Sequence, residues 1–132
     1  MARLVHQAQS AMVASLNEAL APFEVSVAQY AILFALASGR THTATQICKE
    51  LSYSPSAVTR MLNRLEDKGL IVRARFSNNR RMKKLELSEK GRLVFPAILA
   101  SSGRGIDWHL GDFDYAELRI FEMLLNKMMH RA

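Results

Sequence analysis

The hydrophobic pattern of this chain changes its period at Gly69, and that change limits the possible folds more than any other feature. Before Gly69, apolar residues recur at the three- and four-residue spacing of amphipathic helices. After it, apolar and basic residues alternate over 70–76, and a second strand-like segment follows over 81–87. Helical spacing resumes after Ser88. We therefore predict a mainly α fold that contains one small β-hairpin wing.

Side chains that accept hydrogen bonds from free N–H groups mark where the helices begin. The most specific case is Ser54, because the Pro55 that follows it lacks an N–H that would be unpaired in the first turn anyway. This pair begins a helix expected over 55–68. A first helix is expected up to about residue 20, before Pro22. The other expected N-caps are Ser26, Thr43 or Thr45, Ser88, and Asp112 or Asp114.

Positive charge is concentrated in the middle of the chain. The 132 residues include 18 Lys and Arg against 12 Asp and Glu, a net charge of +6. Residues 40–92 hold 13 basic and five acidic residues, so this segment alone carries +8 while the ends are mildly acidic. A local basic face displaces counterions from phosphates, so this distribution favours a nucleic-acid partner.

Several other classes of function are not supported by the sequence. Its one Cys, Cys48, is expected to be buried, and the four His show no metal-ligand spacing, so we expect neither a disulfide nor a metal site within one chain. We find no phosphate-binding loop, nucleophile elbow or activated carboxylate pair, and we expect no cofactor and no enzymatic activity. No apolar stretch has the ~20 residues of a membrane span, which leads us to expect a cytoplasmic protein.

Two helices joined by a short turn and followed by a basic hairpin form a winged helix-turn-helix. The second helix, 55–68, fits the major groove, where Arg can pair with guanine and Asn with adenine, so Arg60 and Asn63 are the candidate base readers. The basic hairpin tip is expected to enter an adjacent minor groove. The full set of predicted DNA contacts is Ser54, Ser56, Thr59, Arg60, Asn63, Arg64, Arg80, Arg81, Lys83 and Lys84.

Residues 26–91 resemble the multiple-antibiotic-resistance regulator (MarR) family of winged helix-turn-helix repressors. The resemblance is carried by Gln29 and Leu33, the run LSYSPSAVTRMLNRLEDKGLIVR, Arg81 in the wing, and the closing LSEKG. It implies one domain over 1–132, with dimerisation helices at about 1–22 and 89–131 around a DNA-binding lobe at about 26–88. It further implies a homodimer on a pseudo-palindromic duplex, released by a small, often aromatic, ligand.

The wing departs from the family pattern at one position. The family usually has Asp where this chain has Asn79, and the resemblance implies that this Asp fixes the wing through an arginine, here Arg73. Asn79 accepts only a neutral hydrogen bond, which is weaker than a charge-assisted one. We therefore expect a more mobile wing, with one negative charge fewer near the phosphates.

An effector site is expected in the crevice between the first two helices and the DNA-binding lobe. Its candidate lining residues are His6, Gln9, Met12, Tyr30 and Phe34, although packing in the core or an interface is the more usual role for each of them. Two alternatives to a ligand-released repressor stay open. One is a ligand-independent or architectural DNA binder, and the other is a helical adaptor that binds another protein.

Overall fold

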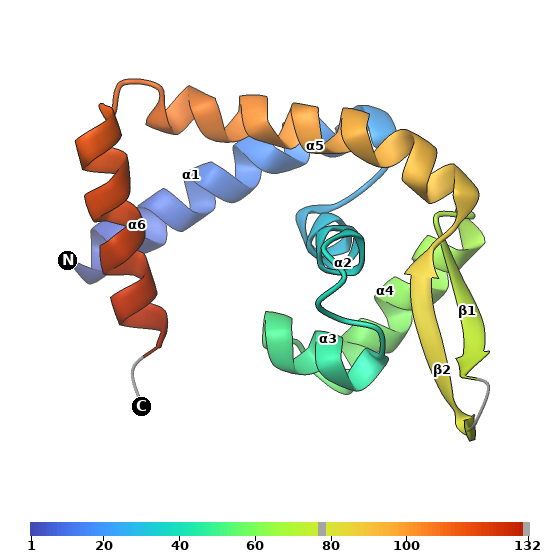
Figure 1. The fold of residues 1–132 in the computed structure, drawn as a ribbon. Helices are drawn as coiled ribbons and strands as arrows, with labels where there is room; N and C mark the ends of the chain where they lie inside the picture. The colour runs from blue at the N-terminus through green and yellow to red at the C-terminus, as the bar shows by residue number, and fades with distance from the viewer. Residues whose placement is uncertain (77–78, 131–132) are drawn as a thin grey trace.

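The computed structural model describes residues 1–76 and 79–130, and the side chains in these ranges except at positions 75–83. Figure 1 shows α1 and α5 side by side along one edge, with the hairpin and α6 at opposite ends of the molecule. The predicted fold class, mainly helical with one hairpin, is confirmed. The elements are α1 (Ala2–Leu20), η1 (Ala21–Phe23), α2 (Val27–Ala37), α3 (Ala44–Leu51), α4 (Pro55–Asp67), β1 (Ile71–Phe76), β2 (Asn79–Leu87), α5 (Glu89–Leu110) and α6 (Tyr115–Met129).

The expected N-caps lie where the sequence indicates. The side chains of Ser26, Thr43, Ser54, Ser88 and Asp114 each accept a hydrogen bond from the backbone N–H three residues later. In α2, α3 and α6 the side chain at the third helical position also accepts a hydrogen bond from the cap backbone N–H, which completes a capping box. Capping is a local interaction, so the helix starts follow from short stretches of sequence.

The second strand begins two residues earlier than the sequence pattern indicates, at Asn79. It pairs antiparallel with β1, placing Ile71 opposite Leu87 and Arg73 opposite Leu85. The Leu85 N–H donates to the His42 carbonyl at 2.6 Å, which ties β2 to the segment before α3. The hairpin is therefore attached to the helices at its base as well as through the chain.

Two glycines, Gly103 and Gly105, lie within the long helix α5 without ending it. α5 continues through both glycines to Leu110 and also contains Pro96. A Cβ atom at residue 105 would lie 3.2 Å from the Ser15 carbonyl oxygen of α1. Glycine at 105 therefore allows the two helices to approach closely, and tertiary packing overrides its low helix propensity.

The core lies where α2, α4, the hairpin and the first half of α5 meet. Its most deeply buried side chains come from every one of these elements, from α3 and from the end of α1: Leu20, Ile32, Leu33, Ile47, Val58, Leu65, Ile71 and Ile98. α2 contributes most because it is apolar on nearly all sides, as expected from its sequence. This core holds α4 by one face only.

The two ends of the chain expose apolar surface instead of burying it. None of the residues of α6 is buried, and its exposed side chains include Ile120, Met123, Leu124 and Met129. Trp108 near the end of α5 is 83% exposed. The accessible surface of the chain is 9675 Å². A compact monomer of this mass exposes about 7,000 Å², so the surplus belongs to an unusually open arrangement of the end helices.

Candidate nucleic-acid interface

The recognition helix α4 is held to the core by one face, so its opposite face is fixed toward solvent. Val58, Leu62 and Leu65 are buried beneath it. The turn that precedes it passes through Ser52 in the left-handed region, with φ of 57°. The predicted DNA contacts of this helix are all exposed: Ser56, Thr59, Arg60, Asn63 and Arg64.

Two hydroxyl groups at the start of α4 already have backbone partners. Ser54 Oγ accepts from the Ala57 N–H at 3.2 Å and lies 3.4 Å from Ser56 Oγ. Thr59 Oγ1 donates to the Pro55 carbonyl at 2.9 Å. Ser54 is therefore a helix cap first, and Thr59 retains only acceptor capacity while this bond persists.

Arg73 of β1 links the wing to the recognition helix. Its Nη2 donates to Asn63 Oδ1 at 2.9 Å, and its Nε lies 3.4 Å from Glu66 Oε2. This contact was not predicted, because Asn63 and Arg73 belong to different elements and only the fold brings them together. The oxygen of Asn63 is occupied by Arg73, so its amide N–H groups are the part presented to a ligand.

The wing itself is described mainly through its backbone. The predicted contacts at Arg80, Arg81 and Lys83, and the side chain of Asn79, lie outside the described side chains. Lys84 is half-buried and lies opposite Ala74 in the register of the two strands. The expected pairing of Arg73 with residue 79 likewise stays a prediction.

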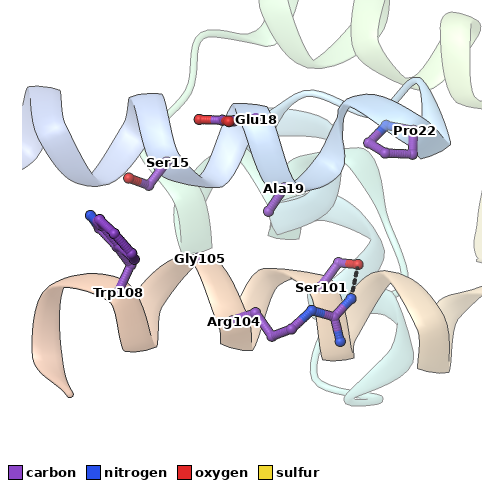
Figure 2. Close-up of a pocket in the computed structure, with 8 residues that line it drawn as sticks. All are labelled: Ser15, Glu18, Ala19, Pro22, Ser101, Arg104, Gly105 and Trp108. Carbon is purple, nitrogen blue, oxygen red and sulfur yellow. Dashed lines mark hydrogen bonds between the residues drawn. The ribbon is translucent and has the colours of Figure 1, made fainter.

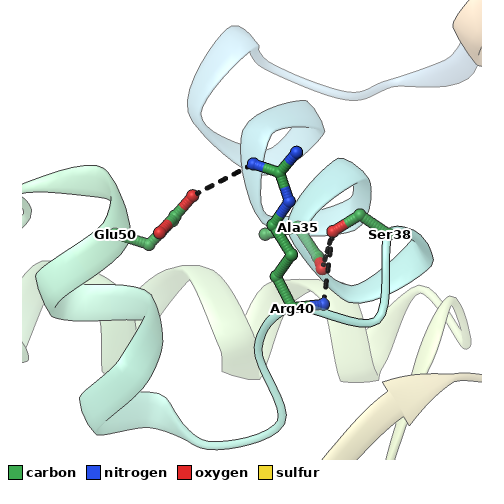
Figure 3. Close-up of polar contacts among 4 residues, drawn as sticks. All are labelled: Ala35, Ser38, Arg40 and Glu50. Atoms are coloured by element: carbon green, nitrogen blue, oxygen red, sulfur yellow. Dashed lines mark hydrogen bonds and ion pairs between the residues drawn. The ribbon is translucent and has the colours of Figure 1, made fainter.

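An ion pair partly neutralises one basic residue, Arg40, in the segment before α3. Figure 3 shows Arg40 directed at Glu50 of α3, with 3.9 Å between Nη1 and Oε1, and the Arg40 N–H donating to Ser38 Oγ. Among the residues whose side chains are described, neither Arg60 nor Arg64 of α4 has a carboxylate within ion-pair distance. Their guanidinium groups are available to phosphates and bases.

The five predicted effector-site residues lie on α1 and α2. Tyr30 and Phe34 contact Phe95, with ring centroids 6.4 and 6.5 Å from it, and Ser102 Oγ donates to the Tyr30 hydroxyl at 2.9 Å. His6 and Gln9 are exposed on α1, and Met12 is half-buried there. None of the five lines either of the two cavities described below.

A cavity of about 610 Å³ lies between α1 and α5. Figure 2 shows Ser15, Glu18 and Ala19 of α1 facing Ser101, Arg104 and Trp108 of α5 across it. Arg104 Nη2 donates to Ser101 Oγ at 2.8 Å, and His109 Nε2 lies 2.6 Å from Ser15 Oγ. A smaller cavity of about 360 Å³ lies between η1, the end of α4 and the start of α5.

Other predicted features are placed as follows. Cys48 is half-buried against the core. Within residues 1–76 and 79–130, no group of three or more His, Cys, Asp or Glu is arranged to hold a metal ion. In the same ranges, no single helix has the length and hydropathy to cross a membrane; only α1 with η1 and α2, taken together across a 75° bend, meet that test.

Known proteins share both the sequence and this fold. Residues 23–82 match the profile of the MarR family. The HTH-type transcriptional regulator YwhA of Bacillus subtilis (strain 168) is 33% identical over 113 residues, which cover 86% of this chain and 81% of that protein. The multiple antibiotic resistance protein MarR of Escherichia coli is 28% identical over 128 residues, 96% of this chain and 89% of that one.

Two crystal structures extend the comparison to bound states. A cysteine-to-serine mutant of E. coli MarR complexed with operator DNA matches with a TM-score of 0.86 and 27% identity, over 96% of this chain and 91% of that one. CouR from Rhodococcus jostii RHA1, bound to p-coumaroyl-CoA, shares the fold with a TM-score of 0.88 at 18% identity, over 98% and 91% of the two chains. This chain therefore belongs to the MarR family, whose members are DNA-binding transcriptional regulators rather than enzymes.

Proposed function

We propose that this protein is a cytoplasmic, homodimeric repressor that binds a pseudo-palindromic operator through α4 and is released by a small aromatic ligand. The observation that carries the proposal is the exposed polar face of α4, fixed by three buried residues beneath it and by Arg73 beside it. E. coli MarR, which has the same fold, has been crystallised with operator DNA. A recognition helix held this firmly is pre-organised for the major groove.

Arg60 and Asn63 are the proposed base readers. Arg60 has no described ion-pair partner, so its guanidinium can donate two hydrogen bonds to guanine. Asn63 accepts from Arg73, which turns its amide N–H groups toward the groove and favours base acceptors there. The remaining contacts are proposed to bind phosphates or the minor groove: Ser54, Ser56, Thr59, Arg64, Arg80, Arg81, Lys83 and Lys84.

The apolar surface of the end helices is the proposed dimer interface. The chain exposes 9675 Å², and the surplus over a compact monomer is about 2,700 Å² per chain, or about 5,400 Å² for two chains, which is comparable to the total area that the larger homodimer interfaces bury. Ile120, Met123 and Leu124 would leave water when a partner's end helices pack against α6. Each dimer then presents two α4 helices about one turn of duplex apart, ~34–36 Å.

The cavity between α1 and α5 is the proposed effector site. Its volume of about 610 Å³ is suited to a small molecule. Trp108 and Arg104 both line it (Figure 2), and we infer that the indole stacks on an aromatic ring while the guanidinium donates to a carboxylate. This location differs from the crevice expected from the sequence, which stays a prediction. CouR, which shares the fold, binds the thioester of an aromatic acid.

The test is selection of bound duplexes from a random pool at two salt concentrations, followed by sequencing. An inverted repeat with half-sites about ten base pairs apart supports a dimeric regulator. Salt-sensitive binding without an enriched sequence favours an architectural role, and no binding at low salt favours an adaptor. Release from the selected duplex by salicylate or a cinnamate, absent in an Arg104→Met variant, supports the effector site.

A further inference from the structure

The turn that follows the recognition helix is bonded to the first residues of α5. Three consecutive carbonyls, those of Lys68, Gly69 and Leu70, each accept a hydrogen bond from this part of the chain. Lys90 Nζ donates to the Lys68 carbonyl at 3.0 Å. Ser88 Oγ donates to the Gly69 carbonyl, and the Ser88 N–H donates to the Leu70 carbonyl at 3.0 Å. We call residues 68–70, with Ser88 and Lys90, the α4–α5 joint.

Lys68 connects the same turn to the beginning of α2. Its ammonium group donates to Gln29 Oε1 at 3.1 Å and to the Glu24 carbonyl. Gln29 is 5% exposed, and as the third residue of α2 it forms the capping box with Ser26. Glu24 has a left-handed backbone, with φ of 57°, immediately after η1. One side chain therefore holds the end of α4 to the start of α2 and to the segment that follows α1 and η1.

We propose that Lys68 and Lys90 are positioning residues that fix α4 relative to the end helices, and so set the half-site separation that the protein accepts. This inference rests on the proposed function, because it concerns a dimer on an inverted repeat. Both ammonium groups act at the boundary between the helix that enters DNA and the helices that carry the partner. A rigid joint permits one separation, whereas a loose joint permits several at similar free energy.

The side chains can be removed without removing the turn. The Gly69 and Leu70 N–H groups bond to the Glu66 and Leu65 carbonyls within the winged unit, and both bonds are independent of the lysines. Both lysines line the smaller cavity together with Phe23, Leu70, Val94 and Ile98. A methionine at either position keeps an apolar side chain of similar length there. Lys68→Met and Lys90→Met therefore delete donors at nearly constant packing, and Lys68→Arg restores donors to the first site.

The experiment measures the affinity of wild-type protein and these variants for a set of duplexes. The duplexes carry the selected half-sites at centre-to-centre separations of about 9 to 12 base pairs, and one carries a single half-site. We expect the wild-type protein to prefer one separation by about tenfold or more, an ordinary coupling between two sites. The methionine variants should prefer it by less than about threefold, while binding the single half-site unchanged. Lys68→Arg should recover the preference.

Two results would overturn the inference while the proposed function stands. An equal loss of affinity at every separation, with a salt slope reduced by about one, would make the lysines phosphate contacts. An unchanged preference, with faster hydrogen exchange at the Ser88 amide, would show that the joint opens without affecting spacing. A wild-type protein that has no preferred separation would refute the dimeric proposal itself, and the positioning role with it.

Discussion

Gly91→Ala should destabilise the protein strongly, although alanine is the better helix former. Gly91 lies in the first turn of α5, and a Cβ there would lie 2.1 Å from the Leu70 carbonyl oxygen. Real Cβ atoms essentially never approach closer than 3.0 Å, so the joint must open by about 1 Å. The two nearest atoms belong to the Leu70 backbone, so a rotamer change cannot relieve the contact.

The expected magnitude follows from two contributions. Overpacking typically costs ~1–3 kcal/mol, and weakening the bond from the Ser88 N–H to the Leu70 carbonyl adds ~1 kcal/mol. The gain in helix propensity offsets about 0.5–1 kcal/mol, which leaves a net loss of about 1–3.5 kcal/mol. For a chain of this length that lowers Tm by about 3–17 °C.

Gly103→Ala is the matched control, because it lies in the same helix with nothing within 4 Å of its added Cβ. This variant should be more stable than wild type by about 0.5–1 kcal/mol. Thermal unfolding of both variants at one fixed protein concentration decides the question, since the stability of an oligomer depends on concentration. If Gly91→Ala matched Gly103→Ala in Tm, the close approach of α5 to Leu70 would not be a constraint on the fold.

Three further predictions concern DNA binding. Arg60→Ala should lower operator affinity by ~1–3 kcal/mol and relax preference at one base pair; an equal loss on all duplexes in a competition assay would make it a phosphate contact. Arg73→Met should leave the free energy of unfolding within about 1–2 kcal/mol of wild type, because the partners of Arg73 are exposed, but weaken discrimination at the base pair that Asn63 contacts. If sequencing of the duplexes selected by this variant gave the same base preferences as wild type, Arg73 would not orient Asn63 for base recognition. Asn79→Asp should weaken binding and alter its salt slope, and affinity equal to wild type at low and high salt would contradict this.

Local features of this chain were predictable and long-range contacts were not. The helix starts at Ser26, Ser54 and Ser88 depend on a side chain and the N–H three residues away, so a short segment specifies them. The continuity of α5 through Gly105 depends on its contact with Ser15 of α1, which no local pattern encodes. An added Cβ at Gly103 would meet nothing within 4 Å, so no close contact explains the glycine at that position.

In the candidate site too, some features follow from the local sequence and others depend on long-range contacts. The exposed positions of α4 follow from helical spacing, because burying one face of a helix fixes the other. The bond from Arg73 to Asn63 joins a strand to a helix, and its partners could be paired only once the register of the hairpin was known. The cavity beside Trp108 and Arg104 requires the packing of two distant helices and was therefore missed.

The first helix has a consequence for how the regulator responds to its own abundance. α1 lacks a side-chain cap, and every residue from 1 to 11 is exposed, so its N-terminal half gains little stability from its own chain. We expect that half to become ordered as two copies associate, which couples folding to association. Operator occupancy would then rise with roughly the square of the free chain concentration. A modest fall in synthesis would clear the operator more sharply than it would for a regulator that binds as a preformed unit.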